Sequence, residues 1–256
     1  MRVMSRLFLV SLVVVITGVL LASRAHAAPA TFSVTNTNDS GAGSLRQAIT
    51  DANSNANAAD MDVIEFNISG SEVHTIAINS DLPLVTEKVT INGYSQPGSS
   101  ENTAASPNPL NSVIKIEISG TNATLSQGIL GVVAQGSIVK GLSIYDGAAP
   151  DSNFTKATLA LVGNDTILQG SYVGVRADGF TTGEYDKNCA NVLVAGTGVL
   201  VGGTNSADRN LLSSECSIGQ AAALAVMGTA EIYGNYIGLA KDGVPILRRK
   251  LQMPMV

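Results

Sequence analysis

The sequence predicts an all-β fold, a solenoid of short stacked strands with a short helix at its N-terminal end. A signature recurs along the chain: residues 168–179 read LQGSYVGVRADG, residues 232–243 read IYGNYIGLAKDG, and a shorter relative, VKGLSIYDG, spans residues 139–147. In the two long copies a glycine, a tyrosine, a β-branched residue, a second glycine and an Asp-Gly turn follow in the same order. A unit this small cannot bury its apolar face alone, so neighbouring units must cover it.

The composition of the chain favours the same fold. The 256 residues include 26 glycines and no tryptophan, and only 4% are aromatic. Small and β-branched residues suit a narrow, regularly turning β-structure better than a helix bundle. The length is enough to bury the core of one domain.

The first residues have the pattern of an export signal. Arg2 and Arg6 give a positive start, residues 7–22 are an uncharged apolar run, and Ala25-His26-Ala27 is a small-x-small cleavage pattern. We place cleavage after Ala27, with Ala30 as a near alternative. An uncleaved anchor is disfavoured because the run is short for a membrane span. We therefore expect an exported protein, extracellular or at the cell surface, with no membrane span after cleavage.

The charge of the mature chain disfavours nucleic acid as a partner. Cleavage reduces the basic residues from 15 to 12 against 20 acidic ones, a net charge of −8. The one basic block, residues 248–250, lies near the end of the chain. Because phosphate binding needs clustered Lys and Arg, we expect no nucleic-acid partner.

Two cysteines, Cys189 and Cys216, lie 27 residues apart, close to one turn of a solenoid. An oxidising compartment allows a disulfide between adjacent coils. Two buried free thiols fit the sequence equally well, since unpaired cysteine packs as a small hydrophobe.

The N-terminal segment predicts a strand followed by a covering helix. Residues 31–36 alternate as one strand, and residues 38–43 form a turn. Ser44 followed by Gln47 has the spacing of a capping box. The next apolar residues fall at i, i+3, i+4 and i+7, one stripe of a short helix: Leu45, Ala48, Ile49 and Ala52. Such a helix would cover the open backbone edge of the first coil.

From residue 63 onward the chain reads as short strands separated by Gly, Asn, Asp and Ser. The expected strands are 63–66, 73–79, 88–92, 113–118, 128–133, 137–144, 158–162, 166–175, 192–201, 223–226 and 231–239. A polar, proline-containing interruption at residues 97–109 predicts a surface loop, more simply an insertion than a functional loop. We expect four parts: a signal peptide (1–27), a cap (28–60), the β-helix (61–244) and an irregular tail (245–256), for which a truncated end is the open alternative.

Three stretches carry a resemblance to a protein family. Residues 32–53, FSVTNTNDSGAGSLRQAITDAN, resemble an N-terminal cap segment related to the caps of polymorphic outer-membrane-type proteins. Residues 89–103, VTINGYSQPGSSENT, and residues 199–213, VLVGGTNSADRNLLS, followed by GNYIGLAKDG, resemble the repeats of bacterial exported right-handed parallel β-helix proteins. Leu239-Ala240 stands where that group has Thr-Asp. The group has no single activity, so the resemblance implies a right-handed parallel β-helix and export rather than a function.

The number of histidines limits the kinds of catalytic or metal site that the mature chain could form. After cleavage His74 is the only histidine, which excludes a multi-histidine metal site and leaves any Ser-His-Asp triad dependent on one residue. His74 lies at a strand position, where a surface or satisfied histidine is the simpler interpretation. We expect no metal site and no cofactor.

Polysaccharide lyases and hydrolases use this fold, so they are the enzyme alternative. They need paired carboxylates, or carboxylates that hold Ca²⁺ beside a base, and Ca²⁺ would be a cofactor only in that case. The candidates are Arg176 with Asp178 and Asp208 with Arg209. Turn geometry alone explains the Asp-Gly at 178–179, so we favour structural roles and no catalytic residue.

The aromatic candidates for ligand binding are Tyr94, Tyr172 and Tyr236, the last two recurring with the repeat. They would form an exposed ladder that binds glycans, or would pack inside the coil, and we favour packing. The expected function is a non-catalytic cell-surface or secreted role, binding or structural, adhesive or associated with polysaccharide and cell-surface glycans.

The export signal makes the first testable prediction. Exported material should begin at Ala28, with Pro29 next, or two to three residues later if Ala30 marks the site. N-terminal sequencing or intact mass of the exported protein measures this directly. Material that retains Met1 to Ala27 would contradict it.

Overall fold

The computed structural model describes residues 28–55, 61–120, 125, 128–147, 157–183, 190–213 and 222–246. The predicted signal peptide, both cysteines and nearly all of the predicted tail lie outside these residues, so cleavage, the disulfide and the tail stay predictions. Within the described ranges no helix is both long and apolar enough to cross a membrane.

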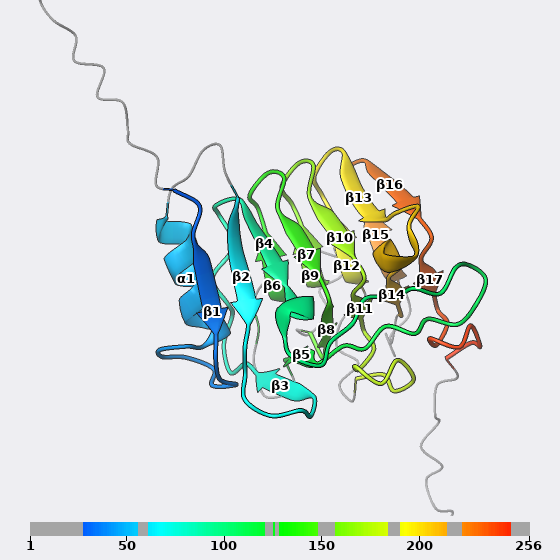
Figure 1. Cartoon of the computed structure of the whole chain (residues 1–256). Helices are drawn as coiled ribbons and strands as arrows, with labels where there is room; N and C mark the ends of the chain where they lie inside the picture. The colour runs from blue at the N-terminus through cyan, green and yellow to red at the C-terminus, as the bar shows by residue number, and fades with distance from the viewer. Residues whose placement is uncertain are drawn as a thin grey trace, which may run out of the picture.

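The strands form three sheets in which every ladder is parallel (Figure 1). The first sheet has the order β1 Thr31–Val34, β2 Asp62–Phe66, β4 Val89–Asn92, β7 Ile138–Lys140, β10 Ile167–Gln169, β13 Val199–Gly202 and β16 Ala230–Tyr233. The second has β3 His74–Ala77, β5 Ile116–Ser119, β8 Leu142–Tyr145, β11 Tyr172–Val173, β14 Leu211–Leu212 and β17 Tyr236–Ile237. The third has β6 Gly128–Val132, β9 Ala157–Leu161, β12 Ala190–Val194 and β15 Ala222–Val226.

From β4 on, the chain visits the three sheets in rotation. It runs from β4 to β5 to β6, returns to the first sheet at β7, and repeats this order up to β17. Each strand therefore pairs with the strand one circuit earlier, for example Leu168 of β10 with Val139 of β7. The prediction of a mostly parallel β fold with few helices is confirmed.

The register stacks equivalent side chains in columns. One column of the first sheet runs through Phe32, Ile64, Ile91, Val139, Leu168, Val201 and Ile232. Leu168 is fully buried, whereas Ile232 is 41% exposed. Both belong to the same column, as predicted, but Ile232 is on the last described strand of the first sheet, so no further described strand of that sheet covers it.

Helix α1, Leu45–Ser54, covers the first coil. Its buried residues are the predicted stripe, which joins the main hydrophobic core. Ser44 caps the helix, since its hydroxyl accepts from Gln47 N at 3.2 Å. The second half of the predicted capping box is absent: Ser44 N donates to Gly41 O, and the Gln47 side chain donates to Asp51 at 2.6 Å.

Several predicted long strands are each two strands joined at a corner. Residues 137–144 divide at Gly141, with φ of 71°, and residues 166–175 divide at Gly170, with φ of 54°. A Cβ atom at Gly141 would lie 2.6 Å from the ring of Tyr94, and one at Gly170 would lie 2.8 Å from its hydroxyl oxygen. Glycine is therefore required at both corners by backbone conformation and by the close approach of Tyr94.

The interior column predicts that truncating its side chains to alanine lowers the unfolding free energy by unequal amounts. Leu168→Ala should cost about 2–5 kcal/mol of unfolding free energy, because it leaves a cavity between two covering strands. Ile232→Ala, in the same column, should cost about 1 kcal/mol or less, because its side chain is already partly in water. Urea unfolding midpoints of the two variants measure the difference, and equal losses would contradict the stacking of the coils.

Candidate functional site

The described chain leaves the outward side of the first sheet open; we call it the open face. Its strands face the viewer in Figure 1. Along β2, β4, β7, β10 and β13 the inward residues are buried, and the outward residues, apart from Gly202, are half-buried. In the second sheet, by contrast, the outward residues of β5, β8, β11 and β14 are buried, among them Glu117, Tyr145 and Tyr172.

Register places the outward residues of the open face in two rows. The first row is mostly apolar and contains Thr31, Val63, Thr90, Ile138, Ile167, Leu200 and Glu231. The second row is mostly polar and contains Ser33, Glu65, Asn92, Lys140, Gln169, Gly202 and Tyr233. Neighbouring strands lie about 4.8 Å apart, so each row repeats at that spacing.

The second sheet is covered by residues 97–115, which we call the strap. The strap runs from the region of β4 toward the last coil, past the lower right of the first sheet in Figure 1. Asn102 donates to Ser206 O at 2.7 Å, and Leu110 N donates to Lys241 O at 2.7 Å. The loop predicted at 97–109 is thus a cross-link between coils that are distant in sequence.

Arg209 holds the strap. Its Nη1 donates to Ala104 O at 3.1 Å and Asn108 O at 3.2 Å, and its Nε donates to Gly234 O at 3.2 Å. Its guanidinium lies 4.5 Å from the centroid of the Tyr236 ring, a cation–π distance. At 3% exposure this candidate catalytic residue is buried and used by the strap.

The other charged candidates have local partners. Asp178 accepts from Phe180 N and Thr181 N at 2.8 Å and from the Thr181 hydroxyl at 2.6 Å. Burial alone would raise the pKa of Asp178, but these hydrogen bonds bring the pKa below its usual value. The Arg176 guanidinium lies 4.8 Å from the centroid of the Tyr145 ring. Asp208 accepts from Asn205 N at 3.0 Å and from its side-chain amide at 2.9 Å, as a cap.

The three candidate tyrosines come together beneath the strap, in a small cluster with Leu110 and Ile114. Leu211 lies between Tyr172 and Tyr236 in the register, so the two rings do not form a continuous ladder. Tyr172 is fully buried, and burial raises the pKa of its hydroxyl. The arrangement corresponds to internal packing.

Each tyrosine hydroxyl also makes a hydrogen bond. Tyr94 donates to Gly170 O at 2.6 Å, and the Tyr172 hydroxyl pairs with that of Ser112 at 2.8 Å. Tyr236 lies 2.9 Å from the carbonyl oxygens of both Pro107 and Asn108. The hydroxyls of Tyr172 and Tyr236 are therefore used to hold the strap, and that of Tyr94 is used by the corner at Gly170.

His74, expected at a satisfied or surface position, is buried at the start of β3. It is 5% exposed, and its Nε2 has no hydrogen-bond partner in the described part of the chain. Within those same residues, no group of three or more His, Cys, Asp or Glu side chains could hold a metal ion.

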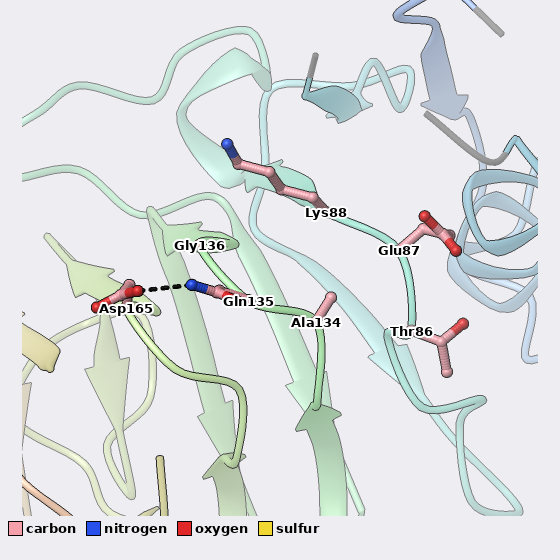
Figure 2. Close-up of a pocket in the computed structure, with 7 residues that line it drawn as sticks. All are labelled: Thr86, Glu87, Lys88, Ala134, Gln135, Gly136 and Asp165. Carbon is pink, nitrogen blue, oxygen red and sulfur yellow. Dashed lines mark hydrogen bonds between the residues drawn. The ribbon is translucent and has the colours of Figure 1, made fainter. Parts of the chain in front are cut away.

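The sequence analysis missed a groove at one edge of the open face. It has a volume of about 480 Å³ and is lined by Thr86, Glu87, Lys88, Ala134, Gln135, Gly136 and Asp165. Figure 2 shows Gln135 pointing toward Asp165, to which its amide donates at 2.8 Å. The lining residues come from three turns that lead into β4, β7 and β10. These turns lie at unequal spacings in the sequence, so no motif marks the groove.

A smaller hollow of about 120 Å³ lies at the opposite ends of β7 and β10. It is lined by Tyr94, Glu101, Lys140, Gln169, Ala207 and Asp208. Lys140 pairs with Glu101 at 3.5 Å across it. The open face is thus bounded by a polar recess at each end of its central strands.

No protein-family model matches this chain, and no curated protein matches it either.

The strap contacts predict unequal effects of removing two cations. Arg209→Ala should lower the unfolding free energy by about 2–3 kcal/mol, because it removes buried charge-assisted hydrogen bonds, and should expose the strap to proteases. Lys140→Ala, which removes a surface ion pair, should change it by about 0–1 kcal/mol. Equal losses, or an unchanged rate of cleavage within residues 103–109, would contradict the role given to Arg209.

Proposed function

We propose that this chain is an exported right-handed parallel β-helix protein that binds an extended, neutral polysaccharide along the open face and does not catalyse its cleavage. The observation that carries the proposal is the open face itself. It presents an apolar row beside a polar row, whereas the outward side of the second sheet is covered.

The proposal of a β-helix is supported by the rotation of the chain among three parallel sheets, with each strand from β7 on paired to the strand one circuit earlier. Right-handedness is the expected hand, because crossovers between parallel strands are right-handed in nearly all known cases. Export rests on the N-terminal signal pattern in the sequence.

The two rows suit the chemistry of a sugar chain. Val63, Ile138, Ile167 and Leu200 offer aliphatic surface to the C–H faces of sugar rings. Lys140 and Gln169 offer an ammonium and an amide group to sugar hydroxyls. Because the rows repeat from strand to strand, they favour an extended polymer over a small molecule.

The charges around the face favour a neutral chain. Six carboxylates lie on the face or line its recesses: Glu65, Glu87, Glu101, Asp165, Asp208 and Glu231. They are accompanied there by two ammonium groups, those of Lys88 and Lys140. This excess of negative charge would repel uronate or sulfated polysaccharides.

A role without turnover is supported by the contacts of the charged candidates. Asp178 and Asp208 organise turns, and Arg209 holds the strap. A rigid scaffold that carries a repetitive face fits an adhesive or structural protein of the cell surface.

One observation favours an enzyme as the second candidate. Glu87, Lys88 and Asp165 line one open groove, which brings two carboxylates and an ammonium group to the edge of the open face. Carboxylates beside a base are what a polysaccharide lyase or hydrolase requires. In this alternative the polysaccharide is cleaved at the groove.

Polysaccharide binding to the open face can be tested by introducing a charged residue on that face. Leu200→Glu should weaken binding of neutral soluble glucans and mannans at least about tenfold, since it adds an unpaired charge to the apolar row. Val73→Glu, at a residue 41% exposed outside the open face, is the matched control and should leave affinity unchanged. Isothermal titration or affinity electrophoresis measures both. Equal effects of the two variants, or no binding to any neutral polysaccharide, would contradict the proposal.

The same polysaccharides test the enzyme alternative. Incubation with the mature protein, with and without Ca²⁺, should release neither reducing ends nor unsaturated sugar ends. Release that Asp165→Asn abolishes would establish the groove as catalytic and replace the binding function. Release lost in Arg176→Lys or Arg209→Lys would implicate those residues instead, because lysine lacks the planar guanidinium fork.

A further inference from the structure

The groove at the edge of the open face lies where two successive turns differ in length. Before these turns, Val85 pairs with Val132. After them, Thr90 pairs with Ile138. The chain advances from residue 85 to residue 90 in the earlier coil and from residue 132 to residue 138 in the later one, so the turn into β4 is one residue shorter than the turn into β7. The two turns therefore do not stack residue on residue, and a gap is left between them.

The turns into β7 and β10, by contrast, have equal lengths, because the strands that flank them pair in a constant register. Gly136 N donates to Asn164 O at 2.9 Å across these two turns. Asp165 N makes the same contact with Thr197 O of the next turn, also at 2.9 Å. These later turns close against one another, so the groove forms at the step beside β4.

The groove lies beside the apolar row of the open face, on the side away from the polar row. Lys88, Gly136 and Asp165 each come two residues before a member of the apolar row. Two residues of a strand span about 6.6 Å, so the groove opens roughly the width of one sugar ring from that row. Gly136 has φ of 69°, and a Cβ atom there would lie 3.2 Å from Lys88 Cε. Glycine at this position keeps the middle of the groove free of a side chain.

The polar groups of the groove include both donors and acceptors. On one side the Gln135 amide donates to Asp165 at 2.8 Å (Figure 2). On the other side lie the hydroxyl of Thr86, the carboxylate of Glu87 and the ammonium of Lys88. Within the described residues, neither Glu87 nor Lys88 forms an ion pair. Sugar hydroxyls both donate and accept, so a neutral sugar can use the whole set, whereas an anionic or a cationic ligand would match only part of it.

The size of the groove suits one sugar unit rather than a chain. Its volume of about 480 Å³ is within the range of about 300–1,000 Å³ that is usual for small-ligand sites. It is lined by three consecutive turns, which span about 9.6 Å at the spacing of neighbouring strands. The rows of the open face, by contrast, continue over all seven strands of the sheet.

We propose that the groove binds a single neutral hexosyl branch of the polysaccharide whose backbone lies along the open face. The assignment rests on the function proposed above, because the backbone must lie on the face for its branch to reach the groove. The repeating rows contact the repeating backbone, and the groove contacts a substituent that projects away from the polar row. Gln135 and Asp165 hydrogen-bond neighbouring hydroxyls of this branch, and Lys88 donates to another of its oxygens. The protein thereby prefers branched to linear chains.

Paired oligosaccharides that share one backbone test the proposal. One pair is a mannan oligosaccharide with and without single galactosyl branches, and the other is a glucan oligosaccharide with and without single glucosyl branches. In at least one pair, the mature wild type should bind the branched form about fivefold or more tightly than the linear form, since the branch adds hydrogen bonds in the groove. Isothermal titration measures both affinities.

Two groove variants and a matched control identify where the branch binds. Gln135→Ala and Asp165→Ala should each remove most of the preference and leave the affinity for the linear form unchanged, because they alter the groove and not the rows. Thr197→Ala should keep the preference, because Thr197 is at the position equivalent to Gln135 two coils later and lies outside the groove. Circular dichroism melting shows whether each variant is folded.

The outcomes separate this proposal from the function of the open face. Equal affinities for branched and linear forms in both pairs, or a preference that survives both groove variants, would overturn the branch site and leave the open face as the binding surface. An equal loss of preference in Thr197→Ala would place the contact outside the groove. Absence of binding to every form would overturn the function of the face and this proposal with it. Release of the branch sugar that Asp165→Ala abolishes would replace binding by catalysis at the groove.

Discussion

The structure depends on equivalent side chains meeting equivalent side chains in successive coils. Leu168 lies between Val139 and Val201, and the same arrangement repeats through the inward residues of all three sheets. Because side chains alternate with a period of two, a slip of one residue would turn a whole inward row to solvent. The open face exists for the same reason, since a register that buries one row must present the alternate row outside. Exposure at Ile232 shows the consequence where the stack of described coils ends.

The strap gives a structural role to residues that the sequence suggests as candidates for ligand binding or catalysis. Tyr94, Tyr172, Tyr236 and Arg209 are the aromatic and cationic groups that commonly bind sugars, yet here they pack against or hydrogen-bond the strap. The buried Arg209 guanidinium donates from Nε and Nη1 to three backbone carbonyls, so it is costly to lose and of little use to a substrate outside. The strap therefore covers the second sheet, whereas the outward residues of the first sheet have no such cover in the described part of the chain.

The parts of the fold that depend on local pattern were predictable from the sequence. The helix at Leu45–Ser54 was predictable because its apolar stripe and its serine cap are adjacent in the sequence. Most strands were also predictable, but their ends were not, because a corner such as Gly141 is set by its contact with Tyr94, 47 positions earlier. The groove could not be predicted, since Lys88, Gln135 and Asp165 meet only through the stacking of coils of unequal length. The coils that the strap contacts could not be predicted either, because its hydrogen bonds, such as Asn102 to Ser206, join residues 104 positions apart.

The stacking of coils is most directly tested by methyl–methyl nuclear Overhauser effects on the mature protein with labelled Leu and Val methyl groups. The account predicts cross-peaks from Leu168 to both Val139 and Val201, two residues about one coil away in opposite directions. Cross-peaks that instead join Leu168 to residues of an adjacent antiparallel hairpin, with none to Val139 or Val201, would contradict the parallel stack.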